Sequence, residues 1–322
     1  MDTTTTSTAE KFGKTFAYIL LFVVALVGNS FIAMIVCRTK TLRKPINFFI
    51  VNMAMSDLLF PIFLFPLELS ELYVGSWLVS GPLGQALCKL VPLLANVSTA
   101  VSIQSMVLIA VDRFEAVVFP LRSPLINKKL CPFFILSTWI VAMAVYSPYL
   151  FASKLVQSQG QLYCDMQWNE TFGESSSQAN YFLAIIVVFH YIPMAWLIVL
   201  YSIILIKLKS QKIPGEKSFN AEKQRASTNR NVLKMAIAIV LGFALCWSPL
   251  NIITLRIMYI AWDNRLYYYA YIARFIASSN SAVNPCICFT FNRNYRRGLK
   301  NLLKYFYALR KRALKNRIAS SS

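Results

Sequence analysis

The chain has 322 residues, of which 57% are hydrophobic and only 14% are charged. This composition is too apolar for a single soluble core and indicates a membrane protein. The net charge of +20 raises nucleic-acid binding as a possible function. The positions of the charges, described below, argue against it.

Seven long apolar stretches follow one another along the chain, and each contains at most one charged residue. They cover residues 15–37, 45–67, 90–111, 130–153, 175–206, 235–255 and 266–292. A helix needs about 20 apolar residues to cross the hydrocarbon of a bilayer, and backbone groups in lipid must be paired within the segment. We therefore predict an all-α membrane protein, with a seven-transmembrane helix bundle over residues 15–290.

Basic residues gather on one side of the predicted bundle. When the seven spans alternate in direction, 26 of the 33 Lys and Arg fall on one side or at its helix ends. Such an excess marks the cytoplasmic side of a membrane protein. It predicts an extracellular N-terminal tail (1–14), which we expect to be disordered, and a cytoplasmic C-terminus. Residues 291–322 predict an amphipathic eighth helix on the anionic leaflet, followed by a basic tail.

Two cysteines and one glycosylation sequon fall on the predicted extracellular side. Cys88 begins the third span and Cys164 lies in the longest outer loop. Both face an oxidising compartment, so we predict a disulfide that holds this loop over the mouth of the bundle. In the same loop, Asn169 opens an Asn-Glu-Thr sequon, which predicts glycosylation.

An acid, Asp57, lies in the middle of the second span. A lone carboxylate at this depth costs roughly 2.5–3.5 kcal/mol, so it is expected to have a partner. One interpretation is a protonated acid that is hydrogen-bonded to its neighbours. The other is a cation site, because Asn29, Ser102, Asn280 and Ser281 lie at similar depth and supply oxygen ligands for Na⁺.

The cytoplasmic ends of the spans carry features of a mobile element. Asp112 and Arg113 close the third span, and helical spacing places Arg113 on the same face as Ser102 and Ala95. An isolated ion pair is the alternative interpretation of Asp112 and Arg113. Pro249 and Pro285 predict kinks in the sixth and seventh spans, and kinked helices around a central arginine suit a two-state switch.

In this order and spacing, these motifs resemble those of rhodopsin-like (class A) G-protein-coupled receptors over nearly the whole chain. Residues 110–113, 119–121 and 291–298 are most similar to neuropeptide receptors of the neuropeptide FF, neuropeptide Y and tachykinin types. The matching residues are Gly28, Asn29, Asn52, Asp57, Cys88, Asp112, Arg113, Phe114, Trp139, Cys164, Pro193, Cys246, Trp247, Ser248, Pro249, Asn284 and Pro285.

The resemblance implies a role for each matched position. It implies a sodium pocket formed by Asp57, Ser102, Asn280 and Ser281, and G-protein coupling through Asp112, Arg113 and Tyr201. The implied activation-switch residues are Ile103, Pro193, Phe243, Trp247, Pro249, Asn284 and Pro285.

Three positions depart from the pattern of the family. Phe114 replaces the usual tyrosine, and the start of the sixth span has no acid to pair with Arg113. The larger departure is Cys288, which stands at the position where the family's Asn-Pro-x-x-Tyr motif has its tyrosine. A thiol cannot reproduce the water-bridged contact of a phenol, which leaves open a receptor-like decoy or an arrestin-biased protein with weak G-protein coupling.

The outer halves of the spans bear on the ligand. Ala95 stands where amine receptors carry an acid, and Ser278 where opsins carry a lysine, so both ligand classes are disfavoured. Charged residues of both signs in the outer halves instead suit a peptide ligand. The alternative interpretation is an internal ion pair between Glu68 or Glu71 and Arg274. The candidate ligand-binding residues are Glu68, Glu71, Ala95, Thr99, His190, Trp247, Thr254 and Arg274. Of these, His190 also suits a hydrogen bond inside the core.

We therefore predict a receptor in the plasma membrane for a neuropeptide-like ligand, acting on a heterotrimeric G protein without enzyme chemistry. Its expected partners are the peptide, the G protein, arrestin and membrane lipids, with no nucleic acid. Na⁺ is expected as an allosteric ion and no obligatory cofactor is expected. A class A receptor for a small non-peptide molecule stays open. A transporter or light-driven pump is disfavoured, since Asp57 is the sole acid at mid-depth and one histidine is present.

Overall fold

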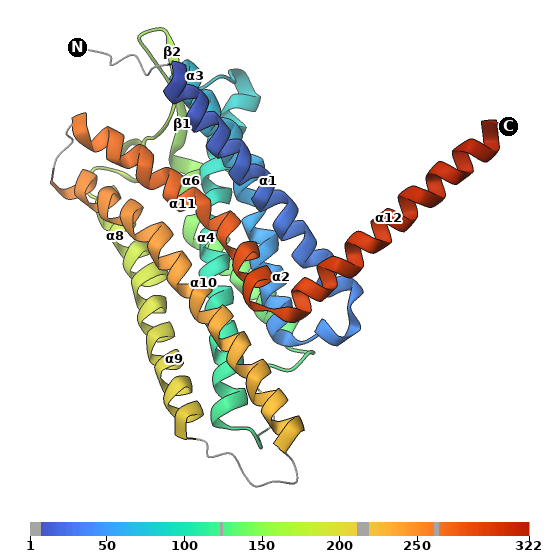
Figure 1. Cartoon of the computed structure of the whole chain (residues 1–322). Helices are drawn as coiled ribbons and strands as arrows, with labels where there is room; N and C mark the ends of the chain where they lie inside the picture. The colour runs from blue at the N-terminus through green and yellow to red at the C-terminus, as the bar shows by residue number, and fades with distance from the viewer. Residues whose placement is uncertain (1–7, 123–124, 211–218, 261–263, 322) are drawn as a thin grey trace.

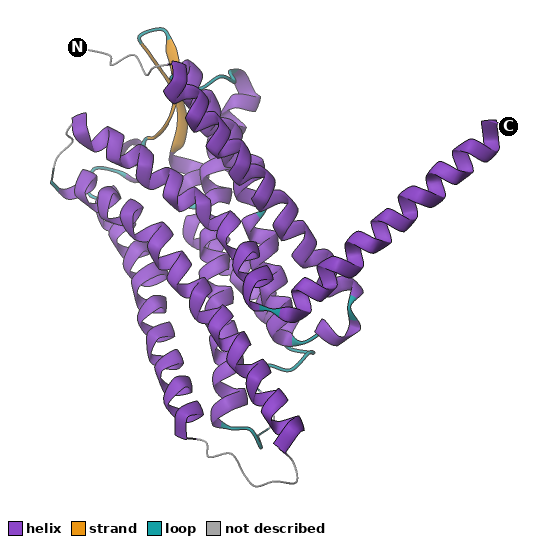
Figure 2. Cartoon of the chain, in the orientation of Figure 1, coloured by secondary structure: helices purple, strands orange, loops and turns teal. Residues whose placement is uncertain are grey.

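The predicted spans form long helices that pack side by side, as the computed structural model shows (Figures 1 and 2). The structure describes residues 8–122, 125–210, 219–260 and 264–321. Within those ranges, the side chains of residues 71, 219–231, 264, 265, 267, 314, 315 and 317–321 lie outside the description.

Six helical segments of the described chain are long and apolar enough to cross a membrane. Three of them are continuous or nearly so: α1 (Thr8–Arg38), α4 (Gly81–Val118) and the 232–259 part of α10 (Phe219–Tyr259). The other three are built from consecutive pieces, namely α2 (Pro45–Asp57) with η2 (Phe60–Leu64) and α3 (Phe65–Val74), α5 (Cys131–Tyr146) with α6 (Pro148–Ala152), and α8 (Gln178–Ile186) with η3 (Val187–Tyr191) and α9 (Ile192–Ser210).

The seventh predicted span is α11 (Asn264–Phe291), which does not reach the same apolar character. It carries Arg274 and the polar residues 278–281 in its middle. Its 28 residues nevertheless rise about 42 Å, more than the roughly 30 Å of hydrocarbon in a bilayer. All seven predicted spans are therefore helical, and the polar residues of α11 need partners inside the bundle.

Two spans widen into π-helical turns at η2 and η3, which the sequence pattern did not predict. Pro61 lies inside η2, and Pro193 follows η3 by two residues. Proline lacks the N–H that would continue the regular ladder, and its ring collides with the carbonyl one turn earlier. An extra residue in one turn rotates the helix beyond it by about 100°, so the face expected for Glu68 from uniform spacing is changed.

Small residues let the helices approach closely. α1 packs between α2 and α11, and α4 contacts α2, α5, α9 and α10. A Cβ atom built on Gly28 of α1 would lie 2.6 Å from the Cβ atom of Pro285 on α11. Likewise, a Cβ atom on Gly298 would lie 2.4 Å from Ile35 of α1. Glycine at these positions therefore sets the separation of α1 from α11 and from the start of α12 (Arg293–Ser321).

The longest outer loop folds into a hairpin of β1 (Ser153–Ser158) and β2 (Gln161–Met166), followed by the short helix α7 (Trp168–Phe172). The all-α prediction did not include these strands. Gln159 and Gly160 both have positive φ, as a tight two-residue hairpin turn requires. The predicted disulfide is confirmed: it joins Cys164 on β2 to Cys88 on α4, with Cα atoms 5.5 Å apart.

The two ends of the described chain are helical. The expectation of a disordered segment was wrong for residues 8–14, because α1 begins at Thr8; residues 1–7 lie outside the described residues. Lys14 pairs with Glu10 and lies 4.4 Å from the centre of the Tyr271 ring on α11. At the other end, α12 leaves the bundle as one helix (Figure 1). Its side chains include Arg and Lys and no Asp or Glu.

Substitution of Gly28 by alanine should destabilise the bundle, because the new methyl group would overlap the rigid ring of Pro285. We expect a loss of about 1–3 kcal/mol, seen as a lower melting temperature of the purified protein. Gly13→Ala is the matched control, since Gly13 lies in the same helix with no atom within 4 Å of an added Cβ. Equal melting temperatures for the two variants would contradict this account.

Candidate functional site

A cavity of about 220 Å³ lies in the outer half of the bundle, between α4, α5–α6, α8–η3 and α10. Four predicted ligand-binding residues line it: Thr99, His190, Trp247 and Thr254. The walls also contain two amides, Asn96 and Asn251, and a set of aromatic rings. Those rings belong to Tyr146, Tyr149, Phe182 and Phe189. The cavity therefore combines aromatic surface with hydrogen-bonding groups, as small-ligand and side-chain pockets do.

The other predicted ligand residues lie elsewhere. Glu68 is only 5% exposed, and the Tyr18 hydroxyl on α1 lies 3.5 Å from its Oε2 atom. Ala95 is buried in an apolar cluster with Tyr18 and Phe65. Arg274 is half-buried on α11, and the side chain of Glu71 lies outside the described residues. The structure thus separates the predicted set into an uncharged aromatic cavity and a charged region near α1, α3 and α11.

Below the cavity, aromatic contacts lead into the main core. The Trp247 ring, which lines the cavity, is 6.1 Å from the ring of Phe243, and the His190 ring stacks on Phe243 at 5.5 Å. Phe243 and Ile103 are almost fully buried in the same apolar core. Pro249 lies inside α10 two residues after Trp247, so the helix lacks a backbone N–H donor close to this contact. Among the described residues, the indole N–H of Trp247 has no acceptor.

Asp57, at the end of α2, is 2% exposed and accepts two hydrogen bonds. Ser102 of α4 donates to its Oδ1 atom at 2.7 Å, and Asn284 of α11 donates to its Oδ2 atom at 2.7 Å. Asn284, which the sequence assigned to the activation switch, is therefore a direct partner of the buried acid. The carboxylate connects three helices at the centre of the bundle.

The other two predicted sodium ligands are buried on α11 but do not hydrogen-bond to Asp57. The Ser281 hydroxyl donates to the carbonyl of Ser278, and the Ser281 carbonyl accepts from Asn29 at 2.9 Å. In the described part of the chain, the buried amide oxygens of Asn29, Asn280 and Asn284 receive no hydrogen bond. Buried oxygens without a donor are expected beside an ordered water or a cation, and oxygen is the ligand type that hard cations prefer, so this set is chemically compatible with Na⁺.

A second polar network joins α2, α4 and α5. Asn52 donates to Ser105 at 2.9 Å and to Thr138 at 3.2 Å, and it accepts from the indole N–H of Trp139 at 2.8 Å. Every hydrogen-bonding atom of the Asn52 amide has a partner here. The network therefore fixes the positions of these three helices without an exposed polar group in the lipid-facing surface.

At the cytoplasmic end of α4, Arg113 forms an ion pair with its neighbour Asp112. Arg113 also borders a gap of about 10 Å³ with Ile204 and Leu208 of α9 and Leu233 of α10. A gap of this size barely admits one water molecule. The gap between α4, α9 and α10 is thus narrow, and Tyr201 is buried in the same core. On another side, Arg113 also borders a larger cleft of about 610 Å³ with Pro120 and Arg122.

Cys288 stands where the family motif has a tyrosine, and the hydroxyl of a different tyrosine, Tyr295, lies nearby. Cys288 is fully buried, and so is Tyr295 at the start of α12. The Tyr295 hydroxyl donates to Oδ1 of Asn47 at 3.1 Å, while the Asn47 amide donates to the carbonyl of Leu42 at 2.7 Å. Burial raises the pKa of Tyr295 well above its ordinary value, so the phenol stays a neutral donor. These bonds join α12 to the cytoplasmic end of α2.

Sequence reasoning missed several residues of the cavity. Asn96 and Asn251 are polar residues in apolar spans, and that alone marks them as candidates. Tyr146 and Tyr149 gave no such signal, because aromatic residues in a span also suit lipid contacts. Their position depends on the break between α5 and α6 at Ser147.

Comparisons with known proteins agree with this arrangement. The family described as 7 transmembrane receptor (rhodopsin family) matches residues 28–287. A RYamide receptor of Drosophila melanogaster is 30% identical over 300 residues, covering 91% of this chain and 64% of that receptor. The Substance-K receptor of Homo sapiens is 29% identical over 287 residues, covering 88% and 71%. Neuropeptide FF receptor 1 of Rattus norvegicus is 30% identical over 301 residues, covering 88% and 68%.

The Tyr295→Phe substitution should weaken the attachment of α12 to α2, because the buried oxygen of Asn47 loses its donor. We expect a cost of about 1–3 kcal/mol and a lower melting temperature of the purified protein. Tyr307→Phe on the same helix is the control, since Tyr307 is 72% exposed. A Tyr295→Phe variant as stable as that control would show that the bond contributes nothing to stability.

Proposed function

This chain belongs to the rhodopsin family of seven-transmembrane receptors, and from that membership we propose that it binds an extracellular peptide and activates a heterotrimeric G protein. It is accordingly a multi-pass membrane protein of a family of signalling receptors. The observation that carries the proposal is one continuous path of buried contacts. It begins at Trp247 in the outer cavity, passes Phe243 in the core, and ends at the narrow gap beside Arg113.

The proposed location is the plasma membrane, with the N-terminus outside and α12 on the cytoplasmic leaflet. The excess of Lys and Arg at one end of the bundle supports this orientation. The Cys88–Cys164 disulfide supports it as well, because disulfides persist on the oxidising side of the membrane. In this orientation Asn169, which is exposed on α7, is available for glycosylation.

A peptide is the ligand class that the outer half favours. The cavity offers aromatic surface and amide groups, while the half-buried Arg274 on α11 lies in the separate charged region. A ligand that reaches both regions needs an apolar or aromatic part and a separate charged part, which a short peptide has. The names of the relatives, a RYamide receptor and a neuropeptide FF receptor among them, support the same ligand class.

In the proposed mechanism, the ligand presses on Trp247 at the bottom of the cavity. The displacement passes to Phe243 and bends α10 at Pro249, where the backbone ladder is already broken. The inner end of α10 then moves away from α4 and α9, and Leu233 no longer closes the gap beside Arg113. The opened face admits the G protein, with Arg113 released from Asp112. Arrestin is the proposed second partner of this face.

Sodium is the proposed modulator of this switch. Asp57 and Ser102 would hold the ion together with the unpaired amide oxygens of Asn29, Asn280 and Asn284. A bound cation would neutralise the buried carboxylate and hold α2, α4 and α11 in the closed arrangement. Its removal on activation couples ion binding to ligand binding.

The receptor function is tested in cells that express the chain together with a sensor of G-protein dissociation. We expect an amidated-peptide library to contain an agonist, and Arg113→Ala to lower its response roughly tenfold or more at equal surface expression. Arg297→Ala, an exposed arginine on α12, is the control for loss of a positive charge.

Three outcomes would oppose the proposal. A response that survives Arg113→Ala contradicts the coupling mechanism. Peptide binding without any G-protein response identifies a decoy or an arrestin-biased protein. Activation by small molecules alone identifies a receptor for a non-peptide ligand.

The cation site is tested without any ligand. Sodium chloride should raise the melting temperature of the purified protein by a few degrees relative to choline chloride at equal concentration. Asp57→Asn keeps the shape of the side chain but removes its charge, so it should abolish this difference. An Asp57→Asn variant that still responds to sodium would exclude Asp57 as a ligand of the ion.

A further inference from the structure

The second half of α12 extends away from the rest of the protein. The first half is fixed to the bundle: Tyr295 is fully buried, and the Arg38 guanidinium of α1 lies 4.3 Å from the centre of the Tyr305 ring. Beyond Tyr305 the helix continues clear of the bundle to its end at Ser321 (Figure 1). We call residues 306–321 the distal segment. It forms more than four helical turns and is about 24 Å long.

Apolar residues of the distal segment follow one face of the helix. Phe306, Leu309 and Ala313 recur at spacings of three and four residues, the period of a helical stripe. The same face begins one turn earlier at Leu302, which is 4% exposed because it packs in the main core. Phe306 and Leu309 continue this face outside the bundle and are 39% and 41% exposed. The stripe therefore presents large apolar side chains to a partner.

Positive charges surround the distal segment. It contains five Lys and Arg and no Asp or Glu. Successive residues of a helix point 100° apart, so Arg310, Lys311 and Arg312 together spread over more than half of the circumference. All three side chains are exposed. A flat anionic leaflet meets one face of a helix and leaves part of this charge in water. A partner that surrounds the helix with acidic groups meets all of it.

We propose that the distal segment binds an acidic protein that surrounds its target helix, of the calmodulin type. The methionine-rich grooves of such a protein take Phe306 and Leu309, and its acidic rims contact the cations at 310–312. These grooves open when calcium binds, so the contact depends on calcium. The inference rests on the cytoplasmic location proposed above for α12. It does not depend on the peptide ligand or the G protein.

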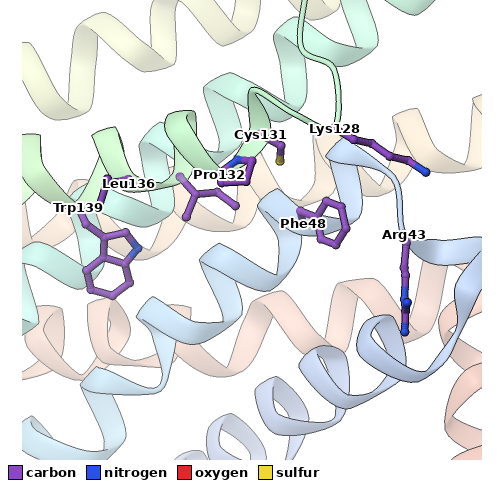
Figure 3. A pocket seen from close by; sticks show the side chains of 8 residues that line it. Arg43, Phe48, Lys128, Cys131, Pro132, Leu136 and Trp139 are labelled. Carbon is purple, nitrogen blue, oxygen red and sulfur yellow. The ribbon is translucent and has the colours of Figure 1, made fainter.

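General attraction between a basic and an acidic protein is the main confounding effect. A second place at the cytoplasmic end also combines cations with apolar surface: a groove of about 580 Å³ between α2 and α5, with Arg43 and Lys128 at one end (Figure 3). Its apolar residues, Phe48 and Leu136 among them, belong to helices packed in the bundle. A partner reaches such residues from one side only. The groove and the first half of α12 therefore supply controls for charge without a free helix.

The experiment uses the full chain in nanodiscs of phosphatidylcholine, with purified calmodulin as the probe and its affinity measured with calcium or with a calcium chelator. We expect one calmodulin to bind per chain, and only with calcium. Apo-calmodulin is also acidic, so the chelator separates use of the open grooves from attraction of charge. Adding phosphatidylserine should weaken the binding without abolishing it, because anionic lipid competes for basic segments.

Charge variants locate the contact on the distal segment. The triple variant Arg310→Gln, Lys311→Gln and Arg312→Gln should weaken calmodulin binding roughly tenfold or more. Its matched control removes three exposed cations from the first half of α12, namely Arg293→Gln, Arg297→Gln and Lys300→Gln. A second control, Arg43→Gln with Lys128→Gln, removes the two cations of the groove. Both controls should leave the affinity unchanged.

A second pair of variants tests the apolar stripe. Phe306→Ala with Leu309→Ala keeps every cation, and alanine keeps the helix, so a loss of roughly tenfold or more reports the apolar contacts alone. Leu121→Ala with Leu125→Ala is the control, because these leucines are 101% and 59% exposed in the loop between α4 and α5. Equal melting temperatures for all variants establish that they are folded.

Four results would overturn the proposal. The first is no calcium-dependent binding to the unchanged chain. Equal losses in the two triple variants would mean that general attraction suffices. Full affinity in the Phe306 and Leu309 variant would show that the apolar stripe is not used. Complete loss of binding in nanodiscs with phosphatidylserine would assign the distal segment to the leaflet instead. Since no peptide or G protein enters the assay, failure here leaves the proposed receptor function standing.

Discussion

The burial of the Asp57 carboxylate is the constraint on which the rest of the bundle depends. An acid surrounded by hydrocarbon-embedded helices is costly unless other groups in the protein solvate it. Ser102 and Asn284 do so from two different helices, at 2.7 Å each. To place these donors, α4 and α11 must meet α2 at one depth. The close contact between Gly28 and Pro285 then follows from the need to bring α11 inward.

The same constraint explains why the polar residues of α11 are tolerated in a span. Ser278, Asn280, Ser281 and Asn284 are all buried. Ser281 and Asn284 bond to their own helix, to Asn29 and to Asp57, and burial keeps the side chains of all four residues away from lipid. A helix with this many polar groups would be unstable alone in a membrane. It is stable here because its polar groups face the inside of the bundle, where Asn29 and Asp57 bind two of them.

Features that depend on periodicity and chemical type were predictable from the sequence. The seven spans, the burial of Asp57 and the Cys88–Cys164 disulfide all follow from apolar length, charge and compartment. The resemblance to class A receptors added the expectation about Arg113. Of the predicted ligand residues, Thr99, His190, Trp247 and Thr254 line one cavity.

What escaped prediction depends on local breaks in regular geometry. The π-helical turn at Pro61 changes the helical face beyond it, so uniform spacing could not place Glu68 beside Tyr18. The hairpin of β1 and β2 depends on two residues with positive φ, and Gln159 is not a residue type that marks such a turn. The early start of α1 rests on contacts of Lys14 and Thr15 with distant aromatic residues. None of these contacts leaves a periodic signal in the sequence.

The continuity of α4 has a mechanical consequence. One uninterrupted helix carries Cys88 near its outer end and Arg113 near its inner end, about 38 Å apart along the axis. The disulfide joins the hairpin to the outer part of α4. About halfway along the same helix, Ser102 donates a hydrogen bond to Asp57. α4 therefore connects the outer hairpin, the buried acid and Arg113 within one helix. In the mechanism proposed above, α10 bends while α4 keeps these three places at fixed separations.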